Sequence, residues 1–168
     1  QVQGTIEAAG QRAFQPLFRY ISGANCARVK IPMTAPVTQS PADPPIPRMA
    51  PVTAESGEGS WTVSFLMPAT YTIDTLPQPT DPRVALREIP ARRIAAIRYA
   101  GRWTPSSYES HRIRLVEWIA SQGLIPAGSP VWARYNSPFT PAWMRRNEIW
   151  IPLEDAEPPS GQVTCEPR

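Results

Sequence analysis

The placement of its 22 prolines constrains this 168-residue chain more than any other feature. Proline has no backbone N–H and is poorly tolerated inside helices and central strands, so it marks loops and the ends of strands. The prolines cluster around residues 41–51, 77–82, 126–141 and 152–167. They form no PxxP repeat, and we interpret them as boundaries between short elements.

The first predicted helix runs from Ile6 to Ile21. Thr5 can cap it, and Gly23 follows as a typical C-terminal stop. Apolar residues recur inside it at spacings of three and four, which places them on one face: Phe14, Leu17, Phe18 and Ile21. Gly10 and Pro16 interrupt the pattern, so either a kink or two shorter helices is expected.

The second predicted helix starts at Thr104-Pro105, a capping threonine followed by a first-turn proline. It runs to about Gln122, and Gly123 ends it. The helix carries the apolar and aromatic residues Tyr108, Leu115, Trp118 and Ile119.

The other ordered segments are predicted to be extended, because they are rich in β-branched and aromatic residues or contain paired prolines. They cover residues 2–4, 28–38, 61–67, 84–89, 92–100, 131–136 and 147–153. Residues 39–59 and 68–82 are predicted loops, and residues 154–168 form a polar tail.

The order of elements repeats once along the chain. Each half, about 1–67 and 84–153, reads strand, helix ending at glycine, strand, loop, strand, with Gly4 and Gly101 at matching positions. The second half has an additional strand at 84–89 with no counterpart in the first, which suggests a missing first strand and an exposed sheet edge. The expected fold class is α+β: a distorted antiparallel barrel or curved sheet with two outer helices.

Charge and hydropathy exclude two classes of partner. The chain has 17 basic and 14 acidic side chains, a net charge of +3, and its basic residues are scattered. This pattern does not indicate a nucleic-acid interface, although it mildly favours an anionic ligand. No run of 18 apolar residues exists, so no membrane-spanning helix is expected.

The two cysteines, Cys26 and Cys165, leave two alternatives open. They are either two free thiols or a disulfide that ties the tail to the body. The even count, together with a first residue that is Gln1 and not Met, favours an exported (periplasmic or secreted) protein over a cytoplasmic one. The compartment itself stays open.

Four blocks resemble the SOUL haem-binding family, and they occur in the family's order. They are FQPLFRYISGANCARVKIPMTAPVT (14–38), TVSFLMPATYTIDTLPQP (62–79), REIPARRIAAIRYAGRW (87–103) and YNSPFTPAWMRRNEIWI (135–151). The resemblance covers the predicted domain, residues 1–153, apart from the tail. It implies a distorted barrel of antiparallel strands flanked by two helices, similar to effector-binding domains of the gyrase-inhibitor type.

The resemblance also implies a groove between the first helix and the loop at 136–145. Its residues in this chain would be Phe14, Phe18, Arg19, Phe139, Thr140 and Trp143. Aromatic rings can stack on a flat macrocycle, and an arginine can pair with a propionate. Family members can carry basic residues where Gln11 and Thr140 stand here, so propionate binding has less support in this chain.

The expected cofactor is haem or another tetrapyrrole, bound non-covalently, and the purified protein need not contain it. Met33 and His111 are the side chains that could ligate iron, but Met33 lies in an apolar strand and His111 on the second helix, outside the implied groove. We therefore expect binding mainly by apolar contact, without a required axial ligand from the protein.

No catalytic residue is assigned, because a single histidine supports no nucleophilic triad and no zinc or phosphate motif occurs. The sequence Arg145-Arg146-Asn147-Glu148 has two interpretations: anion binding near the mouth of the groove, or a structural role in which Glu148 pairs with an arginine, which is the expected one. Glu148 is also the carboxylate that an enzyme with this groove would use. The leading hypothesis is a tetrapyrrole carrier, buffer or sensor. The alternatives are an enzyme acting on a tetrapyrrole or small apolar substrate in the same groove, and a protein-interaction module that uses the sheet edge. The chain would then be a monomer or a strand-edge dimer.

Overall fold

The fold was taken from a computed structural model, which describes residues 1–42, 59–137 and 139–154. The predicted tail, apart from Glu154, and residues 43–58 of the predicted loop at 39–59 lie outside these residues. The elements follow in the order β1 (Val2–Gly4), α1 (Ile6–Ile21), β2 (Val37–Pro41), β3 (Gly59–Phe65), β4 (Ile94–Tyr99), α2 (Pro105–Ser121), β5 (Val131–Arg134), the 3₁₀ turn η1 (Ala142–Met144) and β6 (Asn147–Pro152). The α+β prediction is confirmed.

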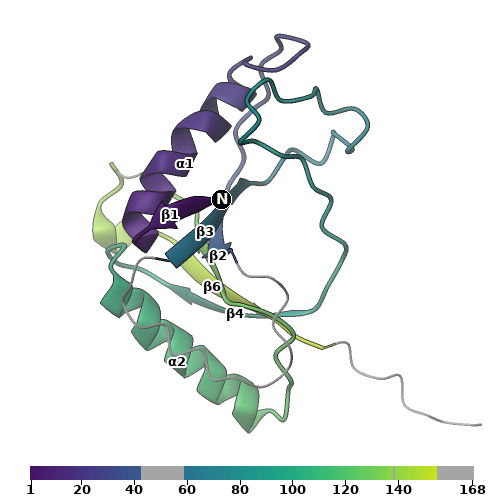
Figure 1. The fold of residues 1–168 in the computed structure, drawn as a ribbon. Helices are drawn as coiled ribbons and strands as arrows, with labels where there is room; N and C mark the ends of the chain where they lie inside the picture. The colour runs from purple at the N-terminus through teal and green to yellow at the C-terminus, as the bar shows by residue number, and fades with distance from the viewer. Residues whose placement is uncertain (43–58, 138, 155–168) are drawn as a thin grey trace, which may run out of the picture.

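The six strands form one antiparallel sheet in the order β1-β3-β2-β5-β6-β4 (Figure 1). Among the described strands β1 and β4 do not pair with each other, so the sheet is open. The barrel alternative in the prediction is therefore wrong, and the curved-sheet alternative holds. β1 and β4 are the two edge strands of this order, and no ladder among the described residues joins them.

Both helices lie on the same face of the sheet. Register partners across five strands form one row: Phe65, Val37, Arg134, Asn147 and Tyr99. Partners in such a row share a face. The Phe65 ring contacts Phe14 of α1, and the Tyr99 ring stacks on His111 of α2 at 4.0 Å. Accordingly, Figure 1 shows α1 over the β1–β3 end and α2 over the β4–β6 end.

α1 has the predicted boundaries. The Thr5 hydroxyl accepts a hydrogen bond from the Ala8 N–H, and Gly23 follows at φ 112°, where glycine is favoured. The helix is continuous through Pro16, so the predicted split does not occur. Pro16 is half-buried on the flank that faces β1 and residues 83–84, where the packing keeps the helix in place.

α2 also follows the prediction: Thr104 caps it through the Ser107 N–H, and Gly123 follows at φ 65°. Its buried residues Leu115 and Ile119 pack on β4 and β6. This core is the larger of two apolar clusters, and its buried members are Ala95, Tyr99, Leu115, Ile119, Ile149, Ile151 and Leu153.

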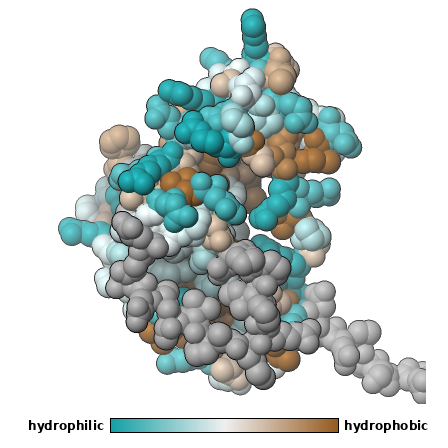
Figure 2. Space-filling view, viewed as in Figure 1, coloured by the Kyte–Doolittle hydropathy of each residue, from teal (hydrophilic) through white to brown (hydrophobic). Residues whose placement is uncertain are grey.

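The second apolar cluster lies at the C-terminal end of α1. Its buried residues are Tyr20, Ile21, Ile31, Leu76 and Val84. The Tyr20 hydroxyl donates to the Pro77 carbonyl oxygen at 2.8 Å, which ties the long connection after β3 to the helix. Figure 2 shows the apolar side chains that gather beside this end of α1.

The predicted strand at 84–89 is wrong. These residues pair with no described strand, although Val84 is buried in the second cluster and Leu86 packs against it. The side chains have β propensity, but prolines 77, 79, 82 and 90 bracket the segment and hold it away from the sheet. Likewise, β2 begins only at Val37, so residues 28–36 of the predicted extended segment stay outside the sheet.

With the 84–89 strand gone, neither half has an additional strand among the described residues. The order β1-β3-β2 mirrors β4-β6-β5 about the β2–β5 pair. That order would follow from two equivalent halves, and the repeat itself stays a prediction. The argument for a missing first strand no longer holds, because the 84–89 segment on which it rested is not a strand.

Candidate functional site

An exposed aromatic face on α1 is the centre of the candidate site. The Phe14 and Phe18 rings stack with centroids 5.7 Å apart and planes 13° from parallel. Phe65 of β3 meets Phe14 edge to face, with centroids 5.4 Å apart. Phe14 is 39% exposed and Phe18 46%, so neither is a core residue.

The sequence of α1 explains why these rings face outward. The small residues Ala9 and Ala13 are buried, and they let the helix lie close to the sheet. Phe14 and Phe18 are one position further round the helix and four apart, which puts them together on the flank of the buried stripe. Leu17, by contrast, is half-buried and packs against the second apolar cluster, as predicted.

Arg19, the predicted propionate partner, is exposed in the last turn of α1. Gln11 is also exposed; it stands where family members can carry a basic residue for propionate binding. Asp81 lies within electrostatic reach of Arg19, but its carboxylate is bound by Arg83 at 2.6 Å. Hydrogen bonds from Arg83 lower the pKa of Asp81 to about 2, so this carboxylate is charged at neutral pH.

The predicted opposite wall, the loop between β5 and β6, has a different character. Phe139 is 95% exposed and Trp143 78% exposed, so both side chains face solvent and are not packed against α1. Thr140 is half-buried, and its carbonyl oxygen accepts from Arg145 Nε at 2.7 Å. The loop nevertheless leaves the sheet near the aromatic face, because Phe65 and Arg134 both pair with Val37 of β2. Two strand spacings, about 10 Å, separate them.

The two candidate iron ligands are placed apart from each other. His111 is half-buried; its Nδ1 lies 2.7 Å from the Ser107 carbonyl oxygen and its ring stacks on Tyr99. Met33 is 48% exposed on the segment before β2. Within the described ranges, no group of three or more His, Cys, Asp or Glu side chains is arranged to hold a metal ion.

Cys26 is exposed just after α1. Its proposed partner Cys165 lies outside the described residues, so the disulfide stays a prediction.

Glu148 is confirmed as an ion-paired residue. It is 8% exposed, and its carboxylate accepts hydrogen bonds from Tyr135 Oη and Trp150 Nε1, each at 2.8 Å, and from Arg146 at 2.6 Å. Burial alone would raise the pKa of Glu148, but these three donors outweigh it and the pKa is lowered. A carboxylate so engaged is a poor proton acceptor or donor at neutral pH, which favours a structural role.

A stack around Trp103 was missed by sequence reasoning. Arg145 lies over the Trp103 ring at 4.4 Å, and Arg134 lies 5.1 Å from Trp103 and 4.2 Å from Trp132. The Trp103 Nε1–H donates to Asn147 Oδ1 at 2.7 Å, and Asn147 is fully buried. These residues come from three separate stretches of the chain, and no local sequence pattern predicts that they contact each other.

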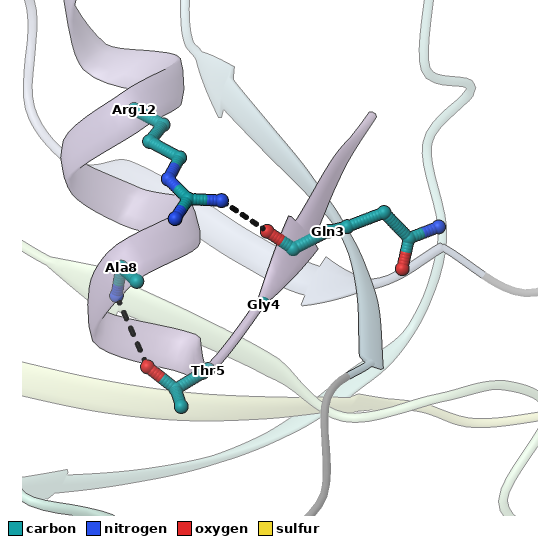
Figure 3. A pocket seen from close by; sticks show the side chains of 5 residues that line it. All are labelled: Gln3, Gly4, Thr5, Ala8 and Arg12. Atoms are coloured by element: carbon teal, nitrogen blue, oxygen red, sulfur yellow. Dashed lines mark hydrogen bonds between the residues drawn. The ribbon is translucent and has the colours of Figure 1, made fainter.

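Two hollows beside Arg12 were also missed. Figure 3 shows the smaller one, about 360 Å³, lined by Gln3, Gly4, Thr5, Ala8 and Arg12. Arg12 Nη1 donates to the Gln3 carbonyl oxygen at 3.2 Å across it. A larger groove of about 550 Å³ continues along the other flank of α1, away from Phe14 and Phe18, past Leu17, Val63 and Val84. The sequence signal for the smaller hollow was Gly4, which lines it. A glycine at the end of a strand can adopt a positive φ, and in the structure its φ is 126°.

The fold and this site define a class: an α+β domain with two helices on one face of an open antiparallel sheet and an exposed aromatic flank on the first helix. The family model for SOUL heme-binding protein matches residues 1–152. The chain belongs to the SOUL haem-binding family.

Comparison with solved structures supports the fold alone. The C-terminal domain of EcmrR superposes with a TM-score of 0.57 at 14% sequence identity, covering 92% of this chain and 89% of that one. No curated protein matches the chain closely enough to count as a relative. Within the described part of the chain, no helix is long and apolar enough to cross a membrane.

Proposed function

We propose that the chain binds haem or another flat apolar tetrapyrrole non-covalently on the aromatic face of α1, as a carrier, buffer or sensor. The observation that carries this proposal is the stacked and exposed pair Phe14–Phe18, supported from below by Phe65. Exposed stacked rings are costly in water and suit a flat partner. Membership of the SOUL haem-binding family supports the same ligand class.

The residues present fit a tetrapyrrole. The two phenylalanine rings offer an apolar surface, and Arg19 at the end of the same helix can approach a carboxylate at the ligand's edge. Phe139, Thr140 and Trp143 would form the opposite wall if the loop between β5 and β6 covers the ligand. Haem supplies an iron centre when bound; the protein's part is to hold the macrocycle by apolar contact.

The His111 imidazole already meets Ser107 and Tyr99, which argues against its use as an iron ligand. Met33 is exposed enough to approach iron without a change of the core. Its substitution by leucine, which preserves apolar volume, would show whether a thioether contributes to the spectrum of the complex.

A haemin titration followed in the Soret band tests the proposal. The wild-type protein should give a saturable shift, and Phe14→Ala with Phe18→Ala should weaken binding about tenfold or more, because each aromatic contact contributes about 0.5–1.5 kcal/mol beyond its area. The matched control is Ile113→Ala with Val116→Ala, which removes exposed apolar side chains from α2. A titration with no saturable shift, or one that the Phe14/Phe18 variant leaves unchanged, would refute the proposal.

The enzymatic alternative gains no support from the site, because the Glu148 carboxylate is fully occupied by neighbouring donors. Turnover of a porphyrin that Glu148→Gln abolishes would be needed to revive it.

A further inference from the structure

The loop between β5 and β6 exposes three large apolar side chains at its tip. Phe139, Trp143 and Met144 are 95%, 78% and 65% exposed, the highest values for large apolar residues in the described ranges. Full burial of such a side chain contributes about 1.5–3 kcal/mol, and here that contribution is not used by the fold. We call Phe139, Trp143 and Met144 the apolar tip.

The backbone of the loop is held by hydrogen bonds, so the exposure of the tip is built into the fold. Tyr135 N–H donates to the Arg146 carbonyl oxygen at 3.2 Å and closes the base of the loop. Within it, Thr140 and Met144 N–H groups donate to carbonyl oxygens three residues earlier. Gly101 N–H donates to the Ala142 carbonyl oxygen at 3.0 Å, which ties the loop to the end of β4.

The two segments that meet at this bond are rich in arginine and free of acidic residues. Close to this bond, residues 98–108 and 134–147 contain no Asp or Glu, and their arginines are Arg98, Arg102, Arg134, Arg145 and Arg146. Arg102 is exposed and follows Gly101 directly, so it lies beside the tip. The nearest described carboxylate in the sequence, Glu148, is buried and bound to Arg146.

We infer that the apolar tip docks on the surface of an anionic lipid bilayer, with Phe139, Trp143 and Met144 entering the headgroup region. Aromatic residues are favoured at the membrane interface, and basic residues beside them are attracted to anionic lipid. A narrow tip of three side chains offers about 500 Å², below the roughly 800 Å² per partner of a stable protein interface. The inference goes beyond the proposed ligand binding. It concerns the ligand-free protein, whereas the proposed ligand site would use Phe139 and Trp143 as its outer wall.

Flotation of the protein with vesicles tests the inference. Vesicles of phosphatidylcholine with about one third phosphatidylglycerol should carry the wild-type protein, and vesicles of phosphatidylcholine alone should carry far less. Trp143→Ala with Met144→Ala should reduce partitioning about tenfold or more, because the inserted apolar area is lost. Arg102→Ala should reduce it about fivefold, and added salt should act in the same direction.

The matched control is Trp118→Ala. Trp118 is 50% exposed near the C-terminal end of α2, thirteen residues and about 20 Å along the helix from Pro105. This variant should float like the wild type.

Each contrary outcome overturns the inference: no flotation with anionic vesicles, equal flotation of the tip variant, or an equal loss in Trp118→Ala. Self-association that the tip variant abolishes, without flotation, would assign the tip to a protein interface instead. Because no tetrapyrrole is present in this assay, its failure leaves the haemin titration unaffected. Thermal melts followed by circular dichroism verify that the exposed-site variants are folded.

Discussion

Replacing Glu148 by glutamine probes the most heavily hydrogen-bonded carboxylate described in the protein. Its Oε2 accepts from Tyr135 and Trp150, and its Oε1 accepts twice from Arg146, at 2.8 and 2.6 Å. A glutamine amide has one acceptor oxygen and one donor NH₂. All the present partners are donors, so the NH₂ group must point either at Tyr135 and Trp150 or at Arg146, where it cannot accept their hydrogen bonds. The less costly arrangement turns the NH₂ toward Arg146, whose side chain is 44% exposed and can turn to water.

The expected loss of unfolding free energy at pH 7 is about 2 kcal/mol. The bonds from Tyr135 and Trp150 change from charge-assisted to neutral, at about 1 kcal/mol each. Loss of the ion pair with Arg146 adds little, because the Arg146 side chain is half-exposed and solvent screens the pair.

The difference in unfolding free energy between the wild type and Glu148→Gln should decrease as the pH falls. Because the folded pKa of Glu148 lies below its ordinary value of 4.5, the carboxylate stabilises the fold above about pH 4.5. That stabilisation is lost as the pH falls through the folded pKa. The gap between wild type and Glu148→Gln should therefore narrow toward pH 3.

Urea unfolding followed by tryptophan fluorescence at pH 7 and pH 3 measures both quantities. Glu117→Gln, an exposed acid on α2, is the matched control and should change stability by less than about 0.5 kcal/mol. A gap of equal size at both pH values, or none at pH 7, would refute the account of Glu148 as a charged structural anchor.

Four further substitutions test the core, two glycine positions and a buried amide. Ile149→Ala on β6, where Ile149 is fully buried, should cost about 3 kcal/mol in urea unfolding, whereas Ile113→Ala at a 44% exposed position should cost below about 1 kcal/mol; equal costs would contradict the assigned core. Gly4→Ala and Gly101→Ala, at φ 126° and 131°, should each cost about 1–3 kcal/mol from backbone strain, since an added Cβ meets nothing closer than 3.7 Å at either site. Asn147→Leu should cost about 2 kcal/mol or more by leaving the Trp103 Nε1–H and the Gly101 carbonyl without their partner, and a stability near wild type would show that water replaces the amide.

The helices were predictable because their ends carry local signals. Thr5 and Thr104 cap, and Gly23 and Gly123 follow each helix in the left-handed region, so both helices were placed within about a residue. Strands β4, β5 and β6 were predicted from another local signal, their runs of β-branched and aromatic residues. The 84–89 segment failed because a strand also requires a free neighbouring edge, and local composition does not report one.

The candidate site was only partly predictable. The spacing of Phe14 and Phe18 indicates a shared face, but their exposure depends on how closely Ala9 and Ala13 let α1 approach the sheet. Phe139 and Trp143 are exposed on a loop that a backbone hydrogen bond, from the Gly101 N–H to the Ala142 carbonyl oxygen, joins to a distant segment, and sequence spacing does not reveal such a bond. The stack of arginines around Trp103 joins residues from distant segments, and sequence spacing does not encode such contacts.

The location of a bound tetrapyrrole is the central claim, and NMR tests it most directly. Zinc protoporphyrin is diamagnetic, and its ring current shifts the amide resonances of nearby residues. Titration into ¹⁵N-labelled protein should shift resonances along the second half of α1, around Phe14 and Phe18, and at Phe65 of β3. Shifts centred instead on Gln3 and Arg12 in the groove on the opposite flank, or no saturable shifts, would contradict the account.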